Sequence, residues 1–390
     1  MTPTTPFLFE LPTRIHFGPG VAKDLPEVLR ELGIRKPLVV ADPGVRGAGL
    51  LEPLMARLRE KGISFDIYDA VEANPKDRDV DRGADAMRRS GRDGLVAVGG
   101  GSPIDCAKAM AVVAAHGGSV RDYGGPGKIP GPTPPIVAIP TTAGTGCEVT
   151  YSAVITDTDR AFKFTVKGPQ IAPRAALMDP ELTLSMPPTL TAATGMDALT
   201  HAVEAYTAAG AHPLSDAAAL HGAELIAQNL ERAVRDGGDL TARSGMLLGS
   251  LLAGIGFSRS DVGGVHCLAE ALGGTYDLPH GVCNAVMLPA VMAYNSAYCP
   301  DRYARIASAM GISWKDVDDG AEKAVAAVAR LATAVGLPSF SSFGIKTADF
   351  PDIARKAALN GSNASNPRPM TADDYEIVLR MLVGAPDAEG

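Results

Sequence analysis

The chain has 390 residues, enough for two domains of ordinary size that each bury a hydrophobic core. Its 36 Lys and Arg against 44 Asp and Glu give a net charge of -8. Because basic residues form no run, we expect no nucleic-acid partner and no membrane surface as partner. The expected partner is a small molecule.

The five cysteines are scattered, odd in number and never arranged as C-x-x-C, which argues against a disulfide framework and against a thiolate zinc site. The N-terminal sequence lacks a basic and apolar leader, and no stretch approaches about 18 uninterrupted apolar residues. We therefore predict a cytoplasmic location.

The first half of the chain alternates short Val-rich runs with amphipathic segments. Such brief runs, stopped by turn residues, are typical of strands buried on both faces of a parallel sheet. The runs are KPLVVAD (36–42), GLVAVGGG (94–101) and PPIVAIPTT (134–142). The intervening segments LLEPLMARLREKG (50–62) and VDRGADAMRRSG (80–91) are predicted helices, each ending at a glycine. This alternation predicts a doubly wound, mainly parallel α/β domain over residues 1–186.

From about Thr191 onward the chain changes character. Nearly every segment is an Ala- and Leu-rich helical pattern punctuated by Gly and Pro, without a convincing strand. The stretch around Pro187 and Pro188 is the predicted boundary. Residues 187–390 are therefore expected to form an all-helical domain.

The segment VAVGGGSPIDCAKAMA runs from a predicted strand through a glycine-rich turn into a helix. Its glycines, among them Gly100 and Gly101, let backbone N–H groups approach an anion, while Ser102 can cap the helix and Asp105 stands where a capping-box acid belongs. A helix start of this kind suits a pyrophosphate. A plain tight turn is the alternative, since the motif is neither G-x-G-x-x-G nor a P-loop.

A second hydroxyl-rich helix start, IPTTAGTGCEVT (139–150), follows the next strand. It offers Thr141, Thr142 and Thr145, the last a potential capping partner of Glu148. Together the two loops predict a dinucleotide site. Asp42, at the end of an earlier strand, could accept both hydroxyls of the adenosine ribose, which favours NAD over NADP, although it could instead be a turn residue.

Four residues of the second half predict a metal site. Asp197 and His201 are four apart on one helix face, so that their side chains can converge on one ion. His266 lies on a later helix, and His280 follows a glycine-rich turn. One carboxylate and three imidazoles suit Fe(II) or Zn(II), which would act as a Lewis acid on an alcohol or a carbonyl.

These motifs together resemble the iron-containing (group III) alcohol dehydrogenases. The similarity spans essentially the whole chain and includes SNPRPMTADD (365–374), which looks like the Asn-Pro-Arg segment of that family. The matching segments are GGGSPIDCAK (99–108), IPTTAGTGCEVT (139–150), residues 192–206 and VHCLAEALGGTYDLPHGVCNAVMLP (265–289).

The resemblance implies a role for each matching position. It makes the carboxylate and three imidazoles of the second half the ligands of an ion that is usually Fe(II), and Zn(II) in some members. It assigns Asn74 and Lys163 to further cofactor contacts. It also implies an α/β cofactor domain, a helical domain that binds the metal, and subunits commonly paired into dimers through the N-terminal strand. The residues that fall on its pyrophosphate loop, its second cofactor loop and its NAD-selecting acid are Gly100, Gly101, Ser102, Thr141, Thr142, Thr145 and Asp42.

Glu270 departs from the pattern. Many members carry a histidine there that is thought to relay protons near the nicotinamide, whereas this chain has a glutamate four residues after His266. We predict that Glu270 is a base or proton relay and that His280 is both a ligand and part of the catalytic site. The alternatives are that Glu270 orients His266 or only forms a polar wall.

The predicted activity is that of an NAD-dependent oxidoreductase which transfers hydride between C4 of the nicotinamide and a metal-bound small alcohol or aldehyde. Three alternatives have the same architecture or the same motifs. They are a maleylacetate reductase-like enzyme, a dehydroquinate synthase-like lyase and a catalytically silent NAD-binding protein. A homodimer or a higher homo-oligomer is expected.

Overall fold

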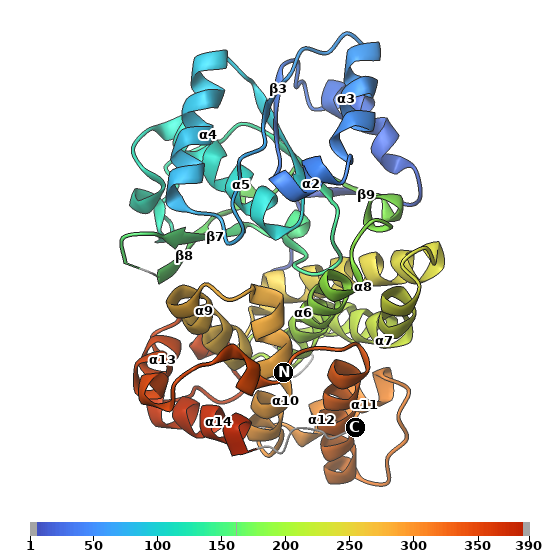
Figure 1. Cartoon of the computed structure of the whole chain (residues 1–390), viewed down its shortest axis with the longest axis vertical. Coiled ribbons are helices and arrows are strands. Elements are labelled where there is room, and N and C mark those ends of the chain that lie inside the picture. The colour runs from blue at the N-terminus through green and yellow to red at the C-terminus, as the bar shows by residue number, and fades with distance from the viewer. Residues whose placement is uncertain (1–5, 161, 385–390) are drawn as a thin grey trace. The chain divides into compact units, whose positions relative to one another are not determined.

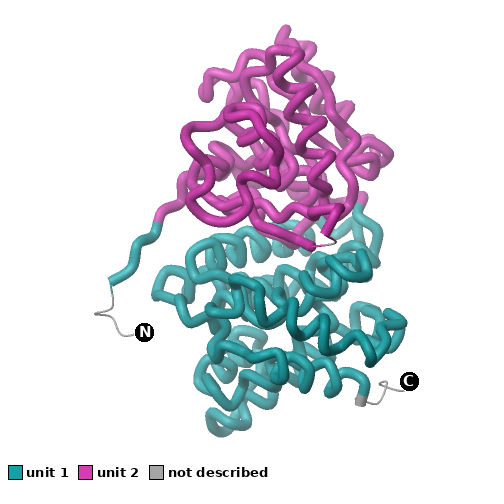
Figure 2. Tube along the Cα trace, turned by 90° about the vertical axis from the view of Figure 1, so that its left-hand side faces the viewer, with its two compact units in different colours: residues 1–9, 186–390 teal, residues 10–185 magenta. Residues whose placement is uncertain are grey.

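The computed structural model describes residues 6–160 and 162–384, which divide into two compact units (Figure 2). One unit comprises residues 10–185, and the other contains the described residues from Met186 onward. Residues 6–9 group with this second, helical unit and not with the sheet, because the Phe7 ring stacks on His212 with 4.4 Å between ring centroids. The described chain thus begins in the helical unit, continues through the unit of residues 10–185 and then returns to the helical unit.

The first unit contains a six-stranded sheet in which every neighbouring pair is parallel (Figure 1). In sheet order its strands are β1 (Arg14–Phe17), β9 (Ala175–Met178), β6 (Ile136–Pro140), β4 (Gly94–Gly99), β2 (Pro37–Val40) and β3 (Asp66–Tyr68). The helices of this unit are α1 (Leu25–Glu31), α2 (Pro43–Gly47), α3 (Leu51–Glu60), α4 (Asp77–Ser90) and α5 (Gly101–His116). The three predicted strands and the helices predicted at 50–62 and 80–91 are confirmed, and α4 ends at Gly91 in the left-handed conformation with φ 63°.

Alternate residues of the central strands bury their side chains in two separate cores. Leu95 and Ala97 of β4 join one core, and Val96 and Val98 join the other. The first core is completed by α4 and α5 and the second by α1 and α3. Both faces of the sheet are therefore covered by helices, which explains why the strands are apolar throughout.

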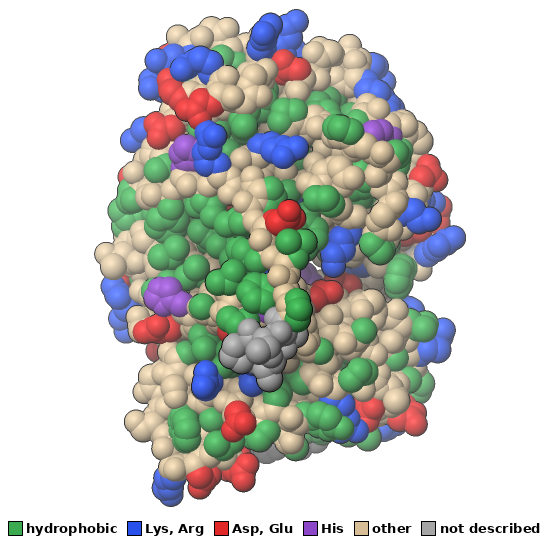
Figure 3. Space-filling view, turned by 180° about the vertical axis from the view of Figure 1, so that it is seen from behind, with side chains coloured by type: hydrophobic (Ala, Val, Ile, Leu, Met, Phe, Trp, Pro, Cys, Tyr) green, Lys and Arg blue, Asp and Glu red, His purple; other side chains and the backbone are tan. Residues whose placement is uncertain are grey.

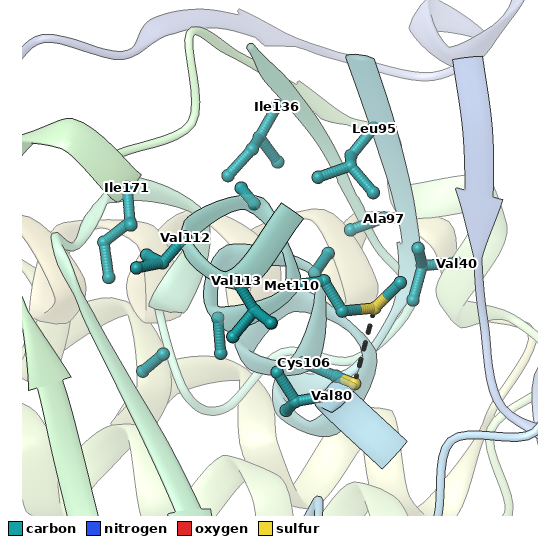
Figure 4. Close-up of a cluster of buried hydrophobic side chains, with 14 of the residues drawn as sticks. Val40, Val80, Leu95, Ala97, Cys106, Met110, Val112, Val113, Ile136 and Ile171 are labelled. Carbon is teal, nitrogen blue, oxygen red and sulfur yellow. Dashed lines mark hydrogen bonds between the residues drawn. The ribbon is translucent and has the colours of Figure 1, made fainter. Parts of the chain in front are cut away.

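The helix α5 lies at the centre of the first of these cores. Figure 4 shows Cys106, Met110 and Val113 of α5 between side chains of the central strands and Val80 of α4. The Cys106 Sγ lies 3.7 Å from the Met110 Sδ. Burial raises the pKa of the Cys106 thiol well above its ordinary value, so that it acts as a small apolar side chain here.

A small second sheet lies outside the predicted elements. It consists of β5 (Gly125–Pro126), β8 (Phe162–Lys167) and β7 (Ser152–Asp157), with β7 and β8 antiparallel. Polar side chains of α5 hold β7, since the Asp105 carboxylate accepts from the Val154 N–H at 2.9 Å and the Lys108 ammonium donates to the Ser152 carbonyl at 2.9 Å. Asp105 is thus used by this strand and not by the start of its own helix.

The second unit is helical throughout its described residues, as expected (Figure 1). Its helices are α6 (Pro188–Thr207), α7 (Pro213–Arg235), α8 (Leu240–Ser260), α9 (Gly264–Tyr276), α10 (His280–Ser296), α11 (Pro300–Ala309), α12 (Val317–Ala334), α13 (Phe350–Ala358) and α14 (Ala372–Gly384). The helices α6, α7 and α8 pack against one another, α10 packs against α6 and α9, and α9 packs against α13. The predicted fold class, an α/β domain followed by a helical one, is confirmed.

The helix α8 is long and apolar enough to cross a membrane by length and composition alone. It is nevertheless a core helix of this unit. In its 18-residue apolar stretch 56% is buried, and glycines bring its backbone close to that of α7. A Cβ placed on Gly222 of α7 would lie 3.0 Å from the carbonyl oxygen of Gly249 on α8.

The surface carries charges of both signs. On the face in Figure 3, Lys and Arg side chains are interspersed with those of Asp and Glu. The described residues of this face show no continuous basic stripe of the kind that tracks a nucleic-acid backbone.

Candidate metal centre and cofactor loops

The helix α6 presents the first two predicted ligands from one buried face. Asp197 is 2% exposed and His201 is 5% exposed, and the Asp197 Oδ1 lies 3.9 Å from the His201 Nδ1. The Phe257 ring of α8 stacks on His201, with 4.5 Å between ring centroids. The apolar packing therefore holds the His201 ring beside the carboxylate.

His266, on the first turn of α9, is the third member of this group. It is 4% exposed, and its Nε2 lies 2.9 Å from the Nε2 of His201. One ligand atom from each of Asp197, His201 and His266 falls within 4.8 Å of the others, a spacing that permits a shared metal ion. The structure thus brings together three of the four predicted ligands in this one cluster.

His280, the first residue of α10, stands slightly apart from this cluster. Its Nε2 lies 4.0 Å from the Asp197 Oδ1, and its side chain is 27% exposed. The start of α10 comes this close to α6 because Gly281 has no side chain, since a Cβ there would lie 2.9 Å from the Ala193 carbonyl oxygen. His280 therefore lies on the more open side of the cluster.

Asn284, one turn after His280, reaches into the middle of the group. Its amide nitrogen lies 2.6 Å from the Asp197 Oδ1, 3.1 Å from the His266 Nε2 and 3.2 Å from the His280 Nε2. Asn284 was not among the residues predicted from the sequence. Its position four residues after a predicted ligand is the signal that could have revealed it.

The balance of donors and acceptors fits a bound cation. The Asn284 amide nitrogen carries two hydrogens but faces three atoms that can accept one. The facing Nε2 atoms of His201 and His266 likewise cannot both be acceptors in one hydrogen bond. A divalent ion would remove the mismatch, because it accepts lone pairs from the Asp197 oxygen and the histidine nitrogens at once.

Electrostatics favour the same arrangement. Burial by itself would raise the pKa of Asp197, but His201, His280 and His266 outweigh burial and hold that pKa below its ordinary value. Burial lowers the pKa of His201 to about 4. The site therefore combines an anionic carboxylate with at least one neutral imidazole near pH 7, which are the protonation states that metal binding needs.

Glu204 is a second residue that the sequence analysis missed. It lies on α6, three residues after His201, and is buried. Its Oε2 lies 2.5 Å from the His266 Nδ1. Burial lowers the pKa of His266, but Glu204 outweighs burial and shifts this pKa above its ordinary value. The spacing from Asp197 and His201 placed Glu204 on the same helix face, which was the available signal.

Glu270 lies on α9, one turn after His266, and is partly exposed. Its Oε2 accepts a hydrogen bond of 2.6 Å from the Asn360 amide nitrogen. The Asn360 Oδ1 accepts in turn from the Ser362 N–H at 2.9 Å, which fixes the orientation of the amide. The carboxylate is thus held by a neutral donor, and its negative charge contributes to the raised pKa of His266.

The two predicted cofactor loops lie side by side at the carboxyl ends of β4 and β6. The Thr141 N–H donates to the Gly99 carbonyl at 3.0 Å. A Cβ on Gly100 would lie 3.0 Å from the Thr142 hydroxyl, and one on Gly101 would lie 2.8 Å from the Thr145 methyl group. The glycines therefore let the threonine loop pack against the start of α5.

The local structure of these loops differs from the predicted caps. The helix α5 begins after Gly100, with no side-chain cap there, so Ser102 lies within its first turn. The predicted helix start after Thr145 is only a short 3-10 turn, Cys147–Val149, and the Thr145 hydroxyl contacts the Cys147 Sγ at 3.1 Å. Glu148 is buried and not paired with Thr145 as a cap.

The remaining predicted cofactor residues lie at two places in the same unit. Asp42 caps α2, since its Oδ1 accepts from the Val45 N–H at 2.9 Å. Asn74 has a positive φ of 50°, and its Oδ1 accepts from the Lys163 ammonium at 2.9 Å. Asn74 and Lys163, 89 positions apart in sequence, are thus brought together.

Comparison with known proteins places both halves of the chain in one family. Residues 12–180 match the family model described as iron-containing alcohol dehydrogenase. Residues 191–383 match the model for the C-terminal part of the Fe-containing alcohol dehydrogenase family.

Individual relatives agree with this over nearly the whole length. The chain is 44% identical over 379 residues to a 1,3-propanediol dehydrogenase of Klebsiella pneumoniae, covering 96% of this chain and 98% of that protein. It is 38% identical over 363 residues to a lactaldehyde reductase of Escherichia coli (strain K12), covering 92% and 94%. The structure of an alcohol dehydrogenase from Oenococcus oeni is similar at a TM-score of 0.94 and 35% identity, covering 97% of this chain and 100% of the other. The chain therefore belongs to the iron-containing alcohol dehydrogenase family.

Proposed function

We propose that the protein is a metal-dependent, NAD(H)-linked alcohol dehydrogenase or aldehyde reductase. It would transfer hydride between C4 of the nicotinamide and a small alcohol or aldehyde. The observation that carries the proposal is the buried convergence of Asp197, His201 and His266. Membership in the family supports it.

Asp197, His201, His266 and His280 are the residues that would hold the ion. Three nitrogens and one carboxylate oxygen suit Fe(II), which we favour on the basis of the family, and also suit Zn(II). When bound, such an ion supplies Lewis acidity that polarises a carbonyl or lowers the pKa of an alcohol. The chain contributes the anionic charge of Asp197, the neutral lone pair of His201 and an apolar wall at Phe257.

The cofactor would bind to the first unit. We assign the pyrophosphate to the backbone N–H groups of Gly100, Gly101 and Ser102 at the start of α5. The remaining contacts are assigned to Thr141, Thr142 and Thr145, to Asn74 and to Lys163. The close packing of the glycine and threonine loops supports this assignment.

Asp42 would select NAD over NADP. Its Oδ1 is engaged at the start of α2, so the other oxygen is the one that we assign to the adenosine ribose. A carboxylate at this position repels a 2′-phosphate.

Short alcohols and aldehydes are the proposed substrates. The relatives are named for 1,3-propanediol and lactaldehyde, which makes compounds of this size the first to test. His280 lies on the more exposed side of the cluster, where a substrate oxygen would enter. We assign Glu270, held by Asn360, to proton transfer.

A cytoplasmic homodimer is the proposed form of the protein. The strand β1 is at the edge of the six-stranded sheet and pairs only with β9 within the described sheet, which leaves backbone groups on its outer side for a second copy.

The test is an assay of the purified protein with NADH and a panel of short aldehydes, before and after removal of metal and reloading with Fe(II) or Zn(II). We expect NADH oxidation that disappears with the metal and returns on reloading. Turnover that is indifferent to chelation would instead favour the metal-independent maleylacetate reductase-like alternative. Absence of turnover under all conditions would contradict the proposed function and favour a lyase or a silent NAD-binding protein.

A further inference from the structure

The start of α9 carries a proposed ligand, but no side chain of its own caps this helix. Its N-cap residue is Gly263, and the next two N–H groups, of Gly264 and Val265, have no partner within the helix. Both are satisfied from elsewhere in the fold. The Gly264 N–H donates to the Asn366 Oδ1 at 3.0 Å, and the Val265 N–H donates to the Glu204 Oε1 at 2.7 Å.

These two capping residues differ in what else they touch. Asn366 belongs to the Asn-Pro-Arg segment and pairs with Asn295 of α10 through two amide hydrogen bonds of 2.9 and 3.0 Å. Glu204 uses its second oxygen on the Nδ1 of His266, at 2.5 Å. The hydrogen bonds of Asn366 thus hold α9 and α10 without reaching an imidazole, whereas Glu204 fixes the start of α9 and the imidazole together.

The close approach depends on the glycine at the helix start. A Cβ on Gly263 would lie 2.9 Å from the Asn366 Oδ1 and 3.2 Å from the Glu204 Oε1. Any other residue would therefore crowd both caps. The glycine at position 263 is thus explained by the two side chains that reach the start of α9.

The Glu204 contact has a chemical consequence for His266. A carboxylate oxygen accepts, so the Nδ1 of the ring must be the atom that carries the hydrogen between them. The Nε2 then points at His201 and at the Asn284 amide, on the side where Asp197 lies. A ligand histidine whose other nitrogen is held by a carboxylate has both its tautomer and its ring orientation fixed.

We propose that Glu204 is a positioning residue that aims the Nε2 of His266 at the metal and thereby sets the affinity for it. The proposal rests on the proposed function only in that the cluster binds a metal. It goes beyond the ligand set, since Glu204 contacts the Nδ1 of the imidazole and not the Nε2 that faces His201. Asn366 of the Asn-Pro-Arg segment has a different role in this proposal, since it holds the start of α9 through the Gly264 N–H.

The test compares Glu204→Gln with Asn366→Ala in chelator-stripped full-length protein. The affinity for Zn(II) is measured by competition with a coloured chelator, and the melting temperature is measured without metal. We expect Glu204→Gln to weaken Zn(II) binding by about 10- to 100-fold, the usual effect of losing such a partner. Asn366→Ala should lower the melting temperature yet change the affinity by less than about threefold, because the hydrogen bonds that it removes, to Gly264 and Asn295, do not involve an imidazole.

Two further results complete the test. Glu204→Asp keeps a negative charge beside the Nδ1–H, so it should bind Zn(II) more tightly than Glu204→Gln. Equal Zn(II) affinity of the wild type and Glu204→Gln would overturn the inference, as would an equal loss in Asn366→Ala, since Glu204 would then act only as a helix cap. Failure of the wild type to bind Zn(II) or Fe(II) would overturn the proposed function as well, so the two failures can be told apart.

Discussion

Among single residues, Glu270 offers the most direct test of how protons move in the proposed reaction. Its carboxylate is held by Asn360, whose amide is oriented by the Ser362 N–H. If Glu270 transfers a proton, Glu270→Gln should lower kcat by at least about tenfold and remove one limb of the pH profile. Steady-state kinetics from about pH 5 to about pH 10 measure kcat and its pH profile, because perturbed carboxyl groups titrate in this range.

Two variants control for packing at this position. Asn360→Ala removes the partner but keeps the carboxylate, so it should retain the pH limb. Glu270→His restores the residue that the family resemblance implies, and it should retain more turnover than Glu270→Gln. An unchanged turnover and pH profile in Glu270→Gln would rule out the proton-transfer role and leave Glu270 as a polar wall.

A second prediction for a single residue concerns Glu148 and the pH dependence of stability. Burial raises its pKa from 4.5 to about 7, against the opposing charge of Lys108. The pKa of Glu148 is higher in the folded state than in the unfolded state. Its contribution to the free energy of unfolding is therefore fully present below about pH 4.5 and is lost as the pH rises through about 7. The wild type should therefore lose about 3 kcal/mol of unfolding free energy over this range relative to Glu148→Gln, at about 1.4 kcal/mol per pKa unit.

Urea unfolding of the wild type and of Glu148→Gln at pH 5 and pH 8 measures this difference. The exposed Glu231→Gln serves as the control and should follow the wild type at both values. Identical pH dependence of the wild type and Glu148→Gln would show that the buried carboxyl does not carry the effect.

The sequence predicted the ligands of the metal site, but it did not predict Glu204 and Asn284, which contact those ligands. Asp197 and His201 were visible because both lie on one helix face at a spacing of four. Glu204 lies on that face too, but its partner is on α9, 62 positions away, and no local pattern encodes that approach. Asn284 was missed for the same reason, since its contacts come from three different helices.

At the scale of whole elements, the contact between α7 and α8 depends on glycines. A Cβ on Gly222 would lie 3.0 Å from the Gly249 carbonyl oxygen and 3.1 Å from the Ala253 nitrogen, both of them backbone atoms. Gly222→Ala should therefore push the two helices apart and lower the free energy of unfolding by about 1–3 kcal/mol. Chemical denaturation measures the change.

The control for this substitution is Gly47→Ala, at the end of α2. A Cβ there meets nothing within 4 Å, so the gain in helix propensity, up to about 1 kcal/mol, is unopposed. The two substitutions should thus differ in sign. A Gly222→Ala protein as stable as the wild type would mean that α7 and α8 do not rely on this close approach.

The elements differ in how well the sequence predicted them. The helices α3 and α4 were predicted because their apolar faces are periodic and a glycine follows each of them. The hairpin of β7 and β8 was not predicted, and neither was the short 3-10 turn after Thr145. For the hairpin, a contact that holds β7 is distant in sequence, namely that of Asp105 with Val154. Asp105 was predicted to cap its own helix, but its carboxylate accepts a hydrogen bond from the Val154 N–H of β7.

For the whole molecule, the change from βα alternation to continuous helix near Pro187 indicated two structural units. The structure divides after Ser185, and the fold class is that of the family. The grouping of residues 6–9 with the helices had no signal in composition, because it depends on the stacking of Phe7 on His212 across more than two hundred residues of sequence.

The proposed function requires a metal held by Asp197, His201, His266 and His280 for turnover with NADH. It is tested most directly by anaerobic titration of chelator-stripped protein with Fe(II), while the oxidation of NADH by a short aldehyde is followed. We expect a rate near zero without metal that rises in proportion to Fe(II) and levels off at one ion per chain. Full activity of the stripped protein, or a rise that shows no break at one ion per chain, would contradict it.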